Sequence, residues 1–569
     1  MVKLPLFQLL LFFTFFLTPS ADKRKTLLDE IRVLKENNKL VCFPDRNEIT
    51  SLLAEEKDIT LLPGSGSYIW KIDTQSDSAQ LYFNQGINTY YGFHIIESLA
   101  SFKKAAKFDQ TNALIWWAQA LAYGPNINDA GYSTSPDAIE AVNKAVEFSK
   151  NATPVERALI HAIQVRYSSD TTKSREFLNQ QYVDAMKDAF EKYPNSPDVI
   201  ALYADALMLQ HPWDLWKPDG TPRDWTPRIQ ETLEKGLAVS NSHPGIHHYY
   251  IHVMEPSPTP DKALASADIL GSITPGLAHL VHMPSHIYLR TGQFNKGAAI
   301  NQQALNQFST YASMFPAVEQ AAFLYSWHNQ HMLVNCAMHA GRYKTAISSA
   351  LQLQQSIDSS SLATAPPMGS LVQYIFMSPV LIHTRFEKWD SLLAMKRPDE
   401  KLVYANILYE FGQGMAHSGM NNAKAARENV ERMDELMKNE ELKIEMTPFS
   451  SAYAGAKTAR ELLVGTIHLK EKQFDKAINH LTTSAKTEEL MVYNEPRDWF
   501  LNPHEYLGSA YLAAKNYTMA EKIFLKDLKL NANNVWSLKG LLAVQNKLKK
   551  RKAAEATTKL LKESLAEVD

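Results

Sequence analysis

The chain has 569 residues, of which 45% are hydrophobic and 10% aromatic, and this composition argues against a disordered protein. Its 59 basic and 61 acidic residues give a formal net charge of −2, which lacks the basic excess expected of a general nucleic-acid-binding surface. With only two cysteines, the sequence supports neither a disulfide framework nor a cysteine-rich zinc site.

Residues 1–21 have the pattern of a secretory signal peptide. Lys3 supplies the positive charge, an apolar run extends to Leu17, and small residues around Ser20 and Ala21 offer a cleavage site. The apolar run is short for a membrane span, although an uncleaved anchor is the alternative interpretation. We therefore expect a secreted or periplasmic protein, cleaved after residue 20 or 21, with no transmembrane span after signal removal.

The rest of the chain predicts paired helices, and the clearest pair lies within Pro503–Asn531. There Gly508, Tyr511, Ala520 and Phe524 match the roughly 34-residue tetratricopeptide pattern, in which small residues occupy the positions where two helices cross closely. Similar units recur along the chain, and strand signals are scarce. The predicted fold class is therefore all-α, a tetratricopeptide-like superhelix of helix hairpins (an α-solenoid).

The predicted array has four parts after the signal peptide. Residues 22–79 form an N-terminal lead-in, 80–358 an N-terminal array, 359–369 a connecting loop and 370–569 a C-terminal array. A second irregular segment, 210–227, interrupts the N-terminal array. Irregular inserts on a rigid scaffold often lie over a binding face.

Histidines gather in one part of the N-terminal array, where ten of the 18 lie between His243 and His339. We set the register of three successive hairpins from the turn glycines Gly292 and Gly341 and from the small residue Ala263. The units above resemble tetratricopeptide repeats, and this resemblance implies that the first helix of each hairpin lines the concave groove. The register therefore predicts that the following residues face the groove together: His248, His252, Glu255, His279, His282, His286, His328 and His331.

Imidazoles with a carboxylate are ligands for transition metals, and we expect copper, zinc or iron here. Pro284 removes a helical hydrogen bond and predicts a kink between His282 and His286. Tyr249, Tyr250 and Tyr288 are candidates for hydrogen bonds to these histidines. Two alternatives stay open: a polar groove without metal, and histidines that serve only in packing. No nucleotide cofactor motif is present.

Several segments carry a family resemblance. HPGIHHYYIHVMEPSPTPDKALASADIL is followed by PGLAHLVHMPSHIYLRTGQF, and later by NEPRDW. These strings resemble exported bacterial-type tetratricopeptide repeat proteins with a His-rich HxxHMPSH core. The resemblance implies the fold and the position of the His-rich pocket, and it matches Glu495 to the late Glu-Pro of that family. It implies no particular reaction.

The sequence therefore predicts an exported repeat protein with a metal-competent, His-rich pocket. Its concave groove would bind a protein, a peptide or a small molecule, and no nucleic acid. The alternative is a metal-dependent enzyme, an oxidoreductase acting on a small organic substrate. In that case Glu255 or Glu495 would act as a ligand or as a catalytic base. Metal storage is a third hypothesis, and whether the protein is an enzyme stays open at this point.

Overall fold

The computed structural model describes residues 58–128, 135–318, 323–445 and 448–565. The predicted signal peptide and the first part of the lead-in lie outside these residues. Within them the regular structure is helical, apart from an isolated bridge between Trp216 and Pro222. None of the described helices is both long and apolar enough to cross a membrane.

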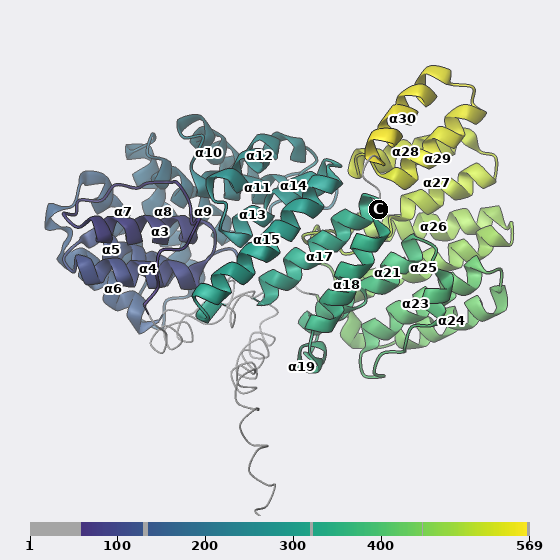
Figure 1. Ribbon diagram of the computed structural model, residues 1–569, viewed down its shortest axis with the longest axis horizontal. Helices are drawn as coiled ribbons and strands as arrows, with labels where there is room; N and C mark the ends of the chain where they lie inside the picture. The colour runs from purple at the N-terminus through teal and green to yellow at the C-terminus, as the bar shows by residue number, and fades with distance from the viewer. Residues whose placement is uncertain (1–57, 129–134, 319–322, 446–447, 566–569) are drawn as a thin grey trace, which may run out of the picture.

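The first half of the array forms one side of the elongated molecule, purple to teal in Figure 1. Its helices are α3 (Asp77–Tyr91), α4 (Ile95–Phe108), α5 (Ala113–Ala122), α6 (Pro136–Glu147), η1 (Ser149–Asn151), α7 (Pro154–Arg166), α8 (Arg175–Lys192), α9 (Pro197–Gln210), α10 (Thr226–Val239), α11 (Pro244–Met254), η2 (Pro260–Ala263), α12 (Leu264–Ile273), α13 (Ala278–His282), α14 (Pro284–Arg290) and α15 (Phe294–Met314).

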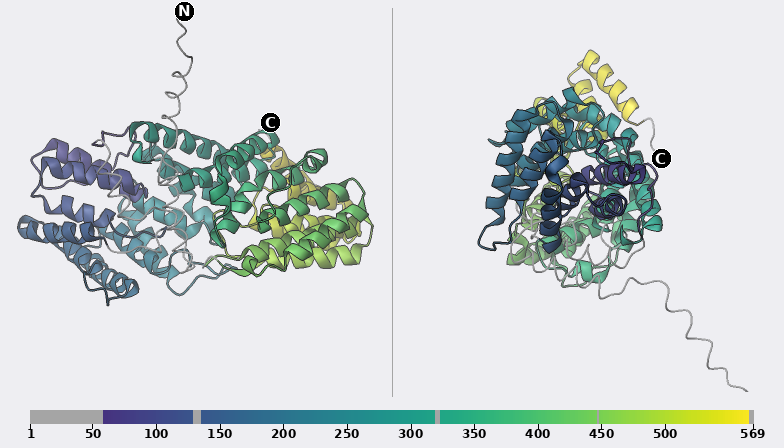
Figure 2. Two further views of the ribbon diagram at one scale, coloured as in Figure 1. Left: turned by 90° about the horizontal axis from the view of Figure 1, so that it is seen from below. Right: turned by 90° about the vertical axis from the view of Figure 1, so that its left-hand side faces the viewer.

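The second half continues the array toward the yellow end of Figure 1, and the left-hand view of Figure 2 shows the same elongated stack. Its helices are α17 (Phe323–His339), α18 (Tyr343–Ser356), α19 (Ser359–Leu362), α20 (Met368–Phe376), α21 (Ser378–Arg385), α22 (Trp389–Leu393), α23 (Val403–Gly419), α24 (Ala423–Leu436), η3 (Glu440–Lys443), α25 (Ala452–Lys470), α26 (Phe474–Glu489), α27 (Pro503–Ala513), α28 (Tyr517–Leu530), α29 (Val535–Lys547) and α30 (Arg551–Ser564).

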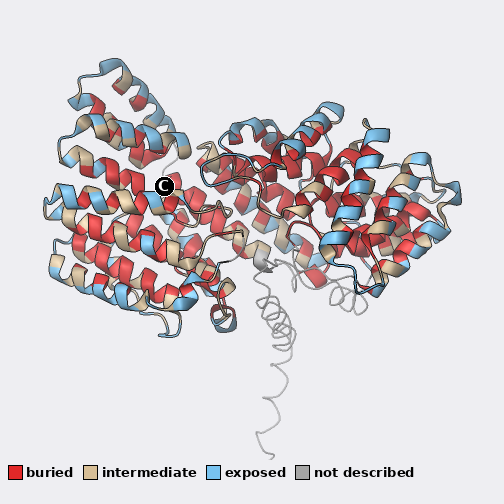
Figure 3. Ribbon diagram, turned by 180° about the vertical axis from the view of Figure 1, so that it is seen from behind, coloured by how far each residue is buried: buried red, intermediate tan, exposed pale blue. Residues whose placement is uncertain are grey.

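Successive helices pack as antiparallel hairpins, which confirms the predicted all-α fold class of tetratricopeptide-like hairpins. The turn glycines Gly292 and Gly341 adopt φ values of +74° and +77°, as a tight helix–helix turn requires. Segment 359–369, expected to be a connecting loop, carries the one-turn helix α19 and the start of α20. Helix faces that point inward are buried along the whole array (Figure 3).

The hairpin α27–α28 shows why small residues stand at the crossings. Phe524 is 1% exposed, and a Cβ added at Gly508 would lie 2.6 Å from its Cε1 atom. Gly540 of α29 approaches the same ring from another helix, so the ring has no room to move aside. Close packing of three helices around one aromatic ring therefore requires glycine at this position.

We predict opposite stability effects for alanine at two helical glycines. Gly508→Ala should destabilise the protein by about 1–3 kcal/mol, because the added methyl overlaps Phe524. Gly271→Ala is the matched control: its Cβ would meet only Ile300 Cδ1 at 3.7 Å, and alanine should stabilise α12 by about 0.5–1 kcal/mol. Thermal or urea unfolding of both variants measures the difference, and the same sign for both would contradict this packing.

Two large hydrophobic clusters form the core, one mainly before and one mainly after α17. The chain returns to the centre of the molecule between α26 and α27. Tyr493, in this returning segment 490–502, donates a hydrogen bond to Glu255, which lies 238 positions earlier. Asn533 likewise donates to the carbonyl of Gly292 at 3.3 Å. C-terminal residues therefore contact the N-terminal array at two places, and the returning segment makes the contact at Glu255.

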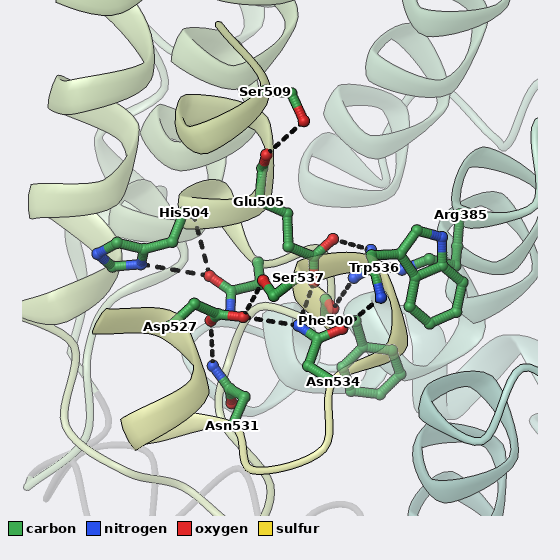
Figure 4. Close-up of polar contacts among 11 residues, drawn as sticks. Arg385, Phe500, His504, Glu505, Ser509, Asp527, Asn531, Asn534, Trp536 and Ser537 are labelled. Atoms are coloured by element: carbon green, nitrogen blue, oxygen red, sulfur yellow. Dashed lines mark hydrogen bonds and ion pairs between the residues drawn. The ribbon is translucent and has the colours of Figure 1, made fainter. Parts of the chain in front are cut away.

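A buried polar network holds the end of the returning segment in place (Figure 4). Arg385 of α21 forms an ion pair with Glu505 of α27 and donates to the carbonyl of Phe500 at 3.2 Å. Asn534 joins this pair to α28 by donating to Glu505 at 2.6 Å and to Asp527 at 2.8 Å. Because a buried charge needs a partner, the network fixes the relative positions of α21, α27 and α28.

Candidate metal centre

Three histidines from two hairpins form the first trio, His248, His252 and His279. His248 and His252 lie one turn apart on α11, and His279 lies on α13. The Nε2 atom of His248 is 3.0 Å from Nε2 of His252 and 3.1 Å from Nε2 of His279. All three side chains are buried. Three imidazole nitrogens therefore point at one small volume.

His282, His286 and His328 form the second trio. The helix breaks at Pro284, as the sequence predicts, so His282 ends α13 and His286 lies in α14. Across this break, Nε2 of His282 is 2.8 Å from Nε2 of His286. His328, from α17, places its Nε2 3.5 Å from that of His286.

Hydrogen bonds at the opposite ring nitrogens orient one imidazole in each trio. Nδ1 of His248 lies 2.6 Å from the carbonyl of Tyr91 and must donate, because a carbonyl only accepts. Nδ1 of His282 lies 2.5 Å from Oδ1 of Asn301, whose amide nitrogen donates to the carbonyl of Gly297. In the neutral ring each Nε2 then carries a lone pair that faces the other nitrogens of its trio.

The six imidazoles differ in pKa. Burial holds the pKa of four of them below its usual value: His248, His279, His282 and His328. Burial also acts to lower the pKa of His252, but hydrogen bonds to Glu255 and then Glu495 outweigh it and raise the pKa to about 9. For His286 the charge of Glu255 outweighs burial and raises the pKa. Without a metal, a proton on each of these two rings can lie between its Nε2 and the facing Nε2 of His248 or His282.

Glu255 lies between the trios. Its Oε1 is 3.1 Å from Nδ1 of His252, and its Oε2 is 2.9 Å from Nδ1 of His286. The second contact lies off the N–H direction of the ring, so it is an ion pair rather than a well-formed hydrogen bond. Tyr493 donates to Oε2 at 3.0 Å. Glu255 therefore contacts the outer nitrogens of one ring in each trio.

The two carboxylates differ in charge. Burial opposes ionisation of Glu255, but the charge of His286 and neighbouring hydrogen bonds hold its pKa well below the usual value. Burial and then the charge of Glu255 raise the pKa of Glu495, whose Oε1 lies 3.2 Å from Nδ1 of His252. The pair thus keeps one ionised carboxylate and one that holds its proton more tightly. Glu255, Glu495 and His252 also form a third group with metal-ligand spacing.

The structure brings together six of the seven predicted histidines and both predicted glutamates. It does not bring in His331, which stacks on Phe500 at 4.8 Å between ring centroids and has a buried Nε2 without a hydrogen-bond partner. The predicted tyrosine hydrogen bonds are also absent. Tyr250 donates to Glu234 and Tyr288 to Asp268, and the Tyr249 hydroxyl is buried without a hydrogen-bond partner.

Sequence reasoning missed three other groups around the trios: Asn301, the carbonyl of Tyr91 and Tyr493. A further contact comes from Trp213 in the irregular segment 210–227, whose ring centroid lies 5.1 Å from that of His252. Only Tyr493 had a usable signal, since it lies two residues before Glu495.

The residues fit a metal ion. Around a tetrahedral ion with nitrogen bonds of about 2.05 Å, ligand nitrogens lie roughly 3.3 Å apart, and the Nε2–Nε2 contacts of 2.8 to 3.5 Å within the trios bracket this value. Metal-binding histidines commonly donate their other ring nitrogen to a carbonyl or carboxylate, as His248 and His252 do here. Three protein ligands leave a fourth position for water or a ligand.

Fold and site together define an all-α repeat protein with six clustered histidines, five of them buried and His328 half-buried. No protein-family model matches the sequence, and no curated protein matches it. Among solved structures, the chain is similar to a human IFIT1 dimer with m7Gppp-AAAA (13% identity, 87% of this chain and 91% of that chain, TM-score 0.29). It is also similar to the Cut9–Hcn1 hetero-tetramer of APC/C (14% identity, 83% of this chain and 78% of that chain, TM-score 0.28). A third similar structure is yeast Tom70 (9% identity, 84% of this chain and 90% of that chain, TM-score 0.27). Such low scores carry no functional argument.

Proposed function

We propose that this protein is a metal-binding repeat protein that holds one transition-metal ion in each histidine trio. Copper, zinc and iron suit imidazole ligands. The observation that supports the proposal is the arrangement of nitrogens: in each trio, Nε2 atoms from two or more helices face one another within hydrogen-bond distance. Lone pairs in that arrangement repel unless a proton or a metal ion lies among them.

The open position on each ion gives the groove a function in ligand binding. A small molecule that reaches the trios would complete the coordination, and the bound metal would supply Lewis-acid or redox chemistry there. Glu255 would orient His252 and His286, while Glu495 would hold or release a proton beside them. A metal-dependent oxidoreductase is therefore the second candidate, and the buried pair of unlike carboxylates is the observation that favours it.

Export remains part of the proposal. It rests on the N-terminal apolar run and its cleavage pattern in residues 1–21. N-terminal sequencing of the mature protein from cells that express the full chain should find a start at residue 21 or 22. A mature protein that still begins at Met1 and stays in the cytoplasm would contradict export without affecting the metal proposal.

The trios predict which histidines matter for metal affinity. His331→Ala should leave both the number of bound ions and their affinity unchanged, because His331 contacts Phe500 and neither trio. Competition with a coloured chelator measures affinity in the tag-free, full-length protein. If His331→Ala removed an ion while its far-UV circular dichroism stayed normal, the assignment of ligands to the two trios would be wrong.

A further inference from the structure

A cavity of about 130 Å³ adjoins the histidine centre between the irregular segment 210–227 and the returning segment 490–502. Trp213 and Tyr493 line it, and both also contact the centre, Trp213 through His252 and Tyr493 through Glu255. Protein cavities of roughly 150 Å³ accommodate a benzene ring. This cavity is therefore suited to a small molecule of that size, held next to the proposed metal site.

Arg290 brings a positive charge into the cavity wall. It ends α14 and lies one helical turn after His286, on the same face of the helix. Its Nη2 donates to the carbonyl of Ser257 at 3.0 Å, and its guanidinium carbon lies 5.6 Å from the ring centroid of Tyr493. Its Nε is buried and has no hydrogen-bond partner. Among the described residues no carboxylate lies within ion-pair distance of it.

The cavity wall carries other charged residues. Asp498 accepts a hydrogen bond from Asn494 at 2.9 Å, Asp219 accepts one from the backbone nitrogen of Thr221, and Lys217 is exposed at the rim. Arg497 pairs with Glu488 at 2.9 Å, and Glu489 pairs with His504 at 2.7 Å and with Lys526. Burial and then the charge of Arg497 lower the pKa of Arg290 to about 10, while the more distant charges of Glu255 and Glu488 act in the opposite direction. Arg290 stays protonated at neutral pH, so the buried part of the wall presents a positive charge that no carboxylate within ion-pair distance neutralises.

The aromatic wall narrows the class of ligand. Trp213, Trp216 and Tyr493 offer apolar surface for a ring or a similar hydrophobic body. The indole nitrogen of Trp213 is a second buried donor without a partner, because only the Trp216 indole is satisfied, by the carbonyl of Val253. One free cation and one free neutral donor suit a singly charged carboxylate better than a multiply charged phosphate.

We propose that this cavity binds a small organic acid with an aromatic or similarly sized apolar body, and that Arg290 and the Trp213 indole recognise its carboxylate. The ligand would then lie against Trp213 and Tyr493, which separate the cavity from His252 and Glu255. Its role beside a metal ion rests on the proposed function, whereas recognition of the carboxylate does not require the metal.

Benzoate and benzamide, which share one shape and differ in charge, test the proposal. Their binding to the tag-free, full-length protein is measured by quenching of tryptophan fluorescence and by calorimetry. Benzoate should bind at least tenfold more tightly than benzamide. Arg290→Met should weaken benzoate binding at least tenfold and leave benzamide binding nearly unchanged. The benzoate affinity of Arg290→Lys should lie between those of the unchanged protein and Arg290→Met. Lys217→Met, at the exposed rim of the same cavity, is the matched control and should bind benzoate normally.

Each outcome decides the proposal. Equal binding of benzoate and benzamide, or benzoate binding that is insensitive to Arg290→Met, would overturn it. The proposal would also be overturned if His282→Ala/His286→Ala lost benzoate binding while Arg290→Met bound benzoate normally. The carboxylate would then be a metal ligand. Charge-selective binding that depends on Arg290 and persists in the histidine variant supports it, even if the protein binds no metal. Circular dichroism checks that every variant is folded.

Discussion

Replacing His282 and His286 together by alanine should reduce the metal content from two ions per chain to one. These rings supply two of the three nitrogens of the second trio, and His328 alone cannot hold an ion. The first trio keeps His248, His252 and His279 and should keep its ion, with weaker binding because Glu255 loses one of its two contacts. Metal content after gel filtration measures the change.

The reciprocal variant, His248→Ala/His252→Ala, should lose the other ion and keep the one in the second trio. Helix content should change little in either variant, because alanine favours helix and each histidine pair lies on or beside a helix end. If either double variant still bound two ions per chain, or if both bound none while fully folded, two separate three-histidine sites would be contradicted.

Glu255→Gln should lower the affinity of each trio for its metal ion by about 10- to 100-fold. That is the usual effect of removing a hydrogen-bond partner from the outer nitrogen of a ligating histidine. The carboxylate contacts Nδ1 of His252 in one trio and of His286 in the other, and glutamine keeps its size without its charge. Metal titration against a chelator of known affinity gives both constants.

Glu495→Gln is the matched control for that experiment. Glu495 also contacts His252, but its pKa is raised, so replacement by a neutral amide removes less charge. We expect a smaller loss of affinity, confined to the first trio. An effect of Glu495→Gln on both ions equal to that of Glu255→Gln would show that Glu255 does not have the special bridging position described above.

Helical spacing explains what could be predicted from the sequence. His248 and His252, and likewise His282 and His286, are four residues apart and share a helix face whatever the tertiary structure. The repeat register then extended the prediction across hairpins, because the turn glycines are fixed points of the pattern. Pro284 itself predicted a helix break, because proline cannot donate a helical hydrogen bond, and the structure ends α13 just before it.

The rest depended on packing that no local pattern contains. His328 and His331 both fit the groove register, yet the ring of His331 turns to Phe500 in the returning segment. That segment approaches only because the array curves back on itself, which also brings Tyr493 to Glu255 across 238 positions. Hydrogen bonds to a main-chain carbonyl, such as that from His248 to Tyr91, cannot be predicted from residue types, because every residue has such a carbonyl.

Elemental analysis of the tag-free, full-length protein tests the central claim most directly. The protein is purified without added metal, or reconstituted with copper, zinc or iron and then freed of excess ion by gel filtration. Two equivalents of one transition metal per chain, retained through the column, are the predicted result. Metal far below one equivalent, even after reconstitution of a folded protein, would contradict the account and leave two clusters of buried imidazoles held apart by protons alone.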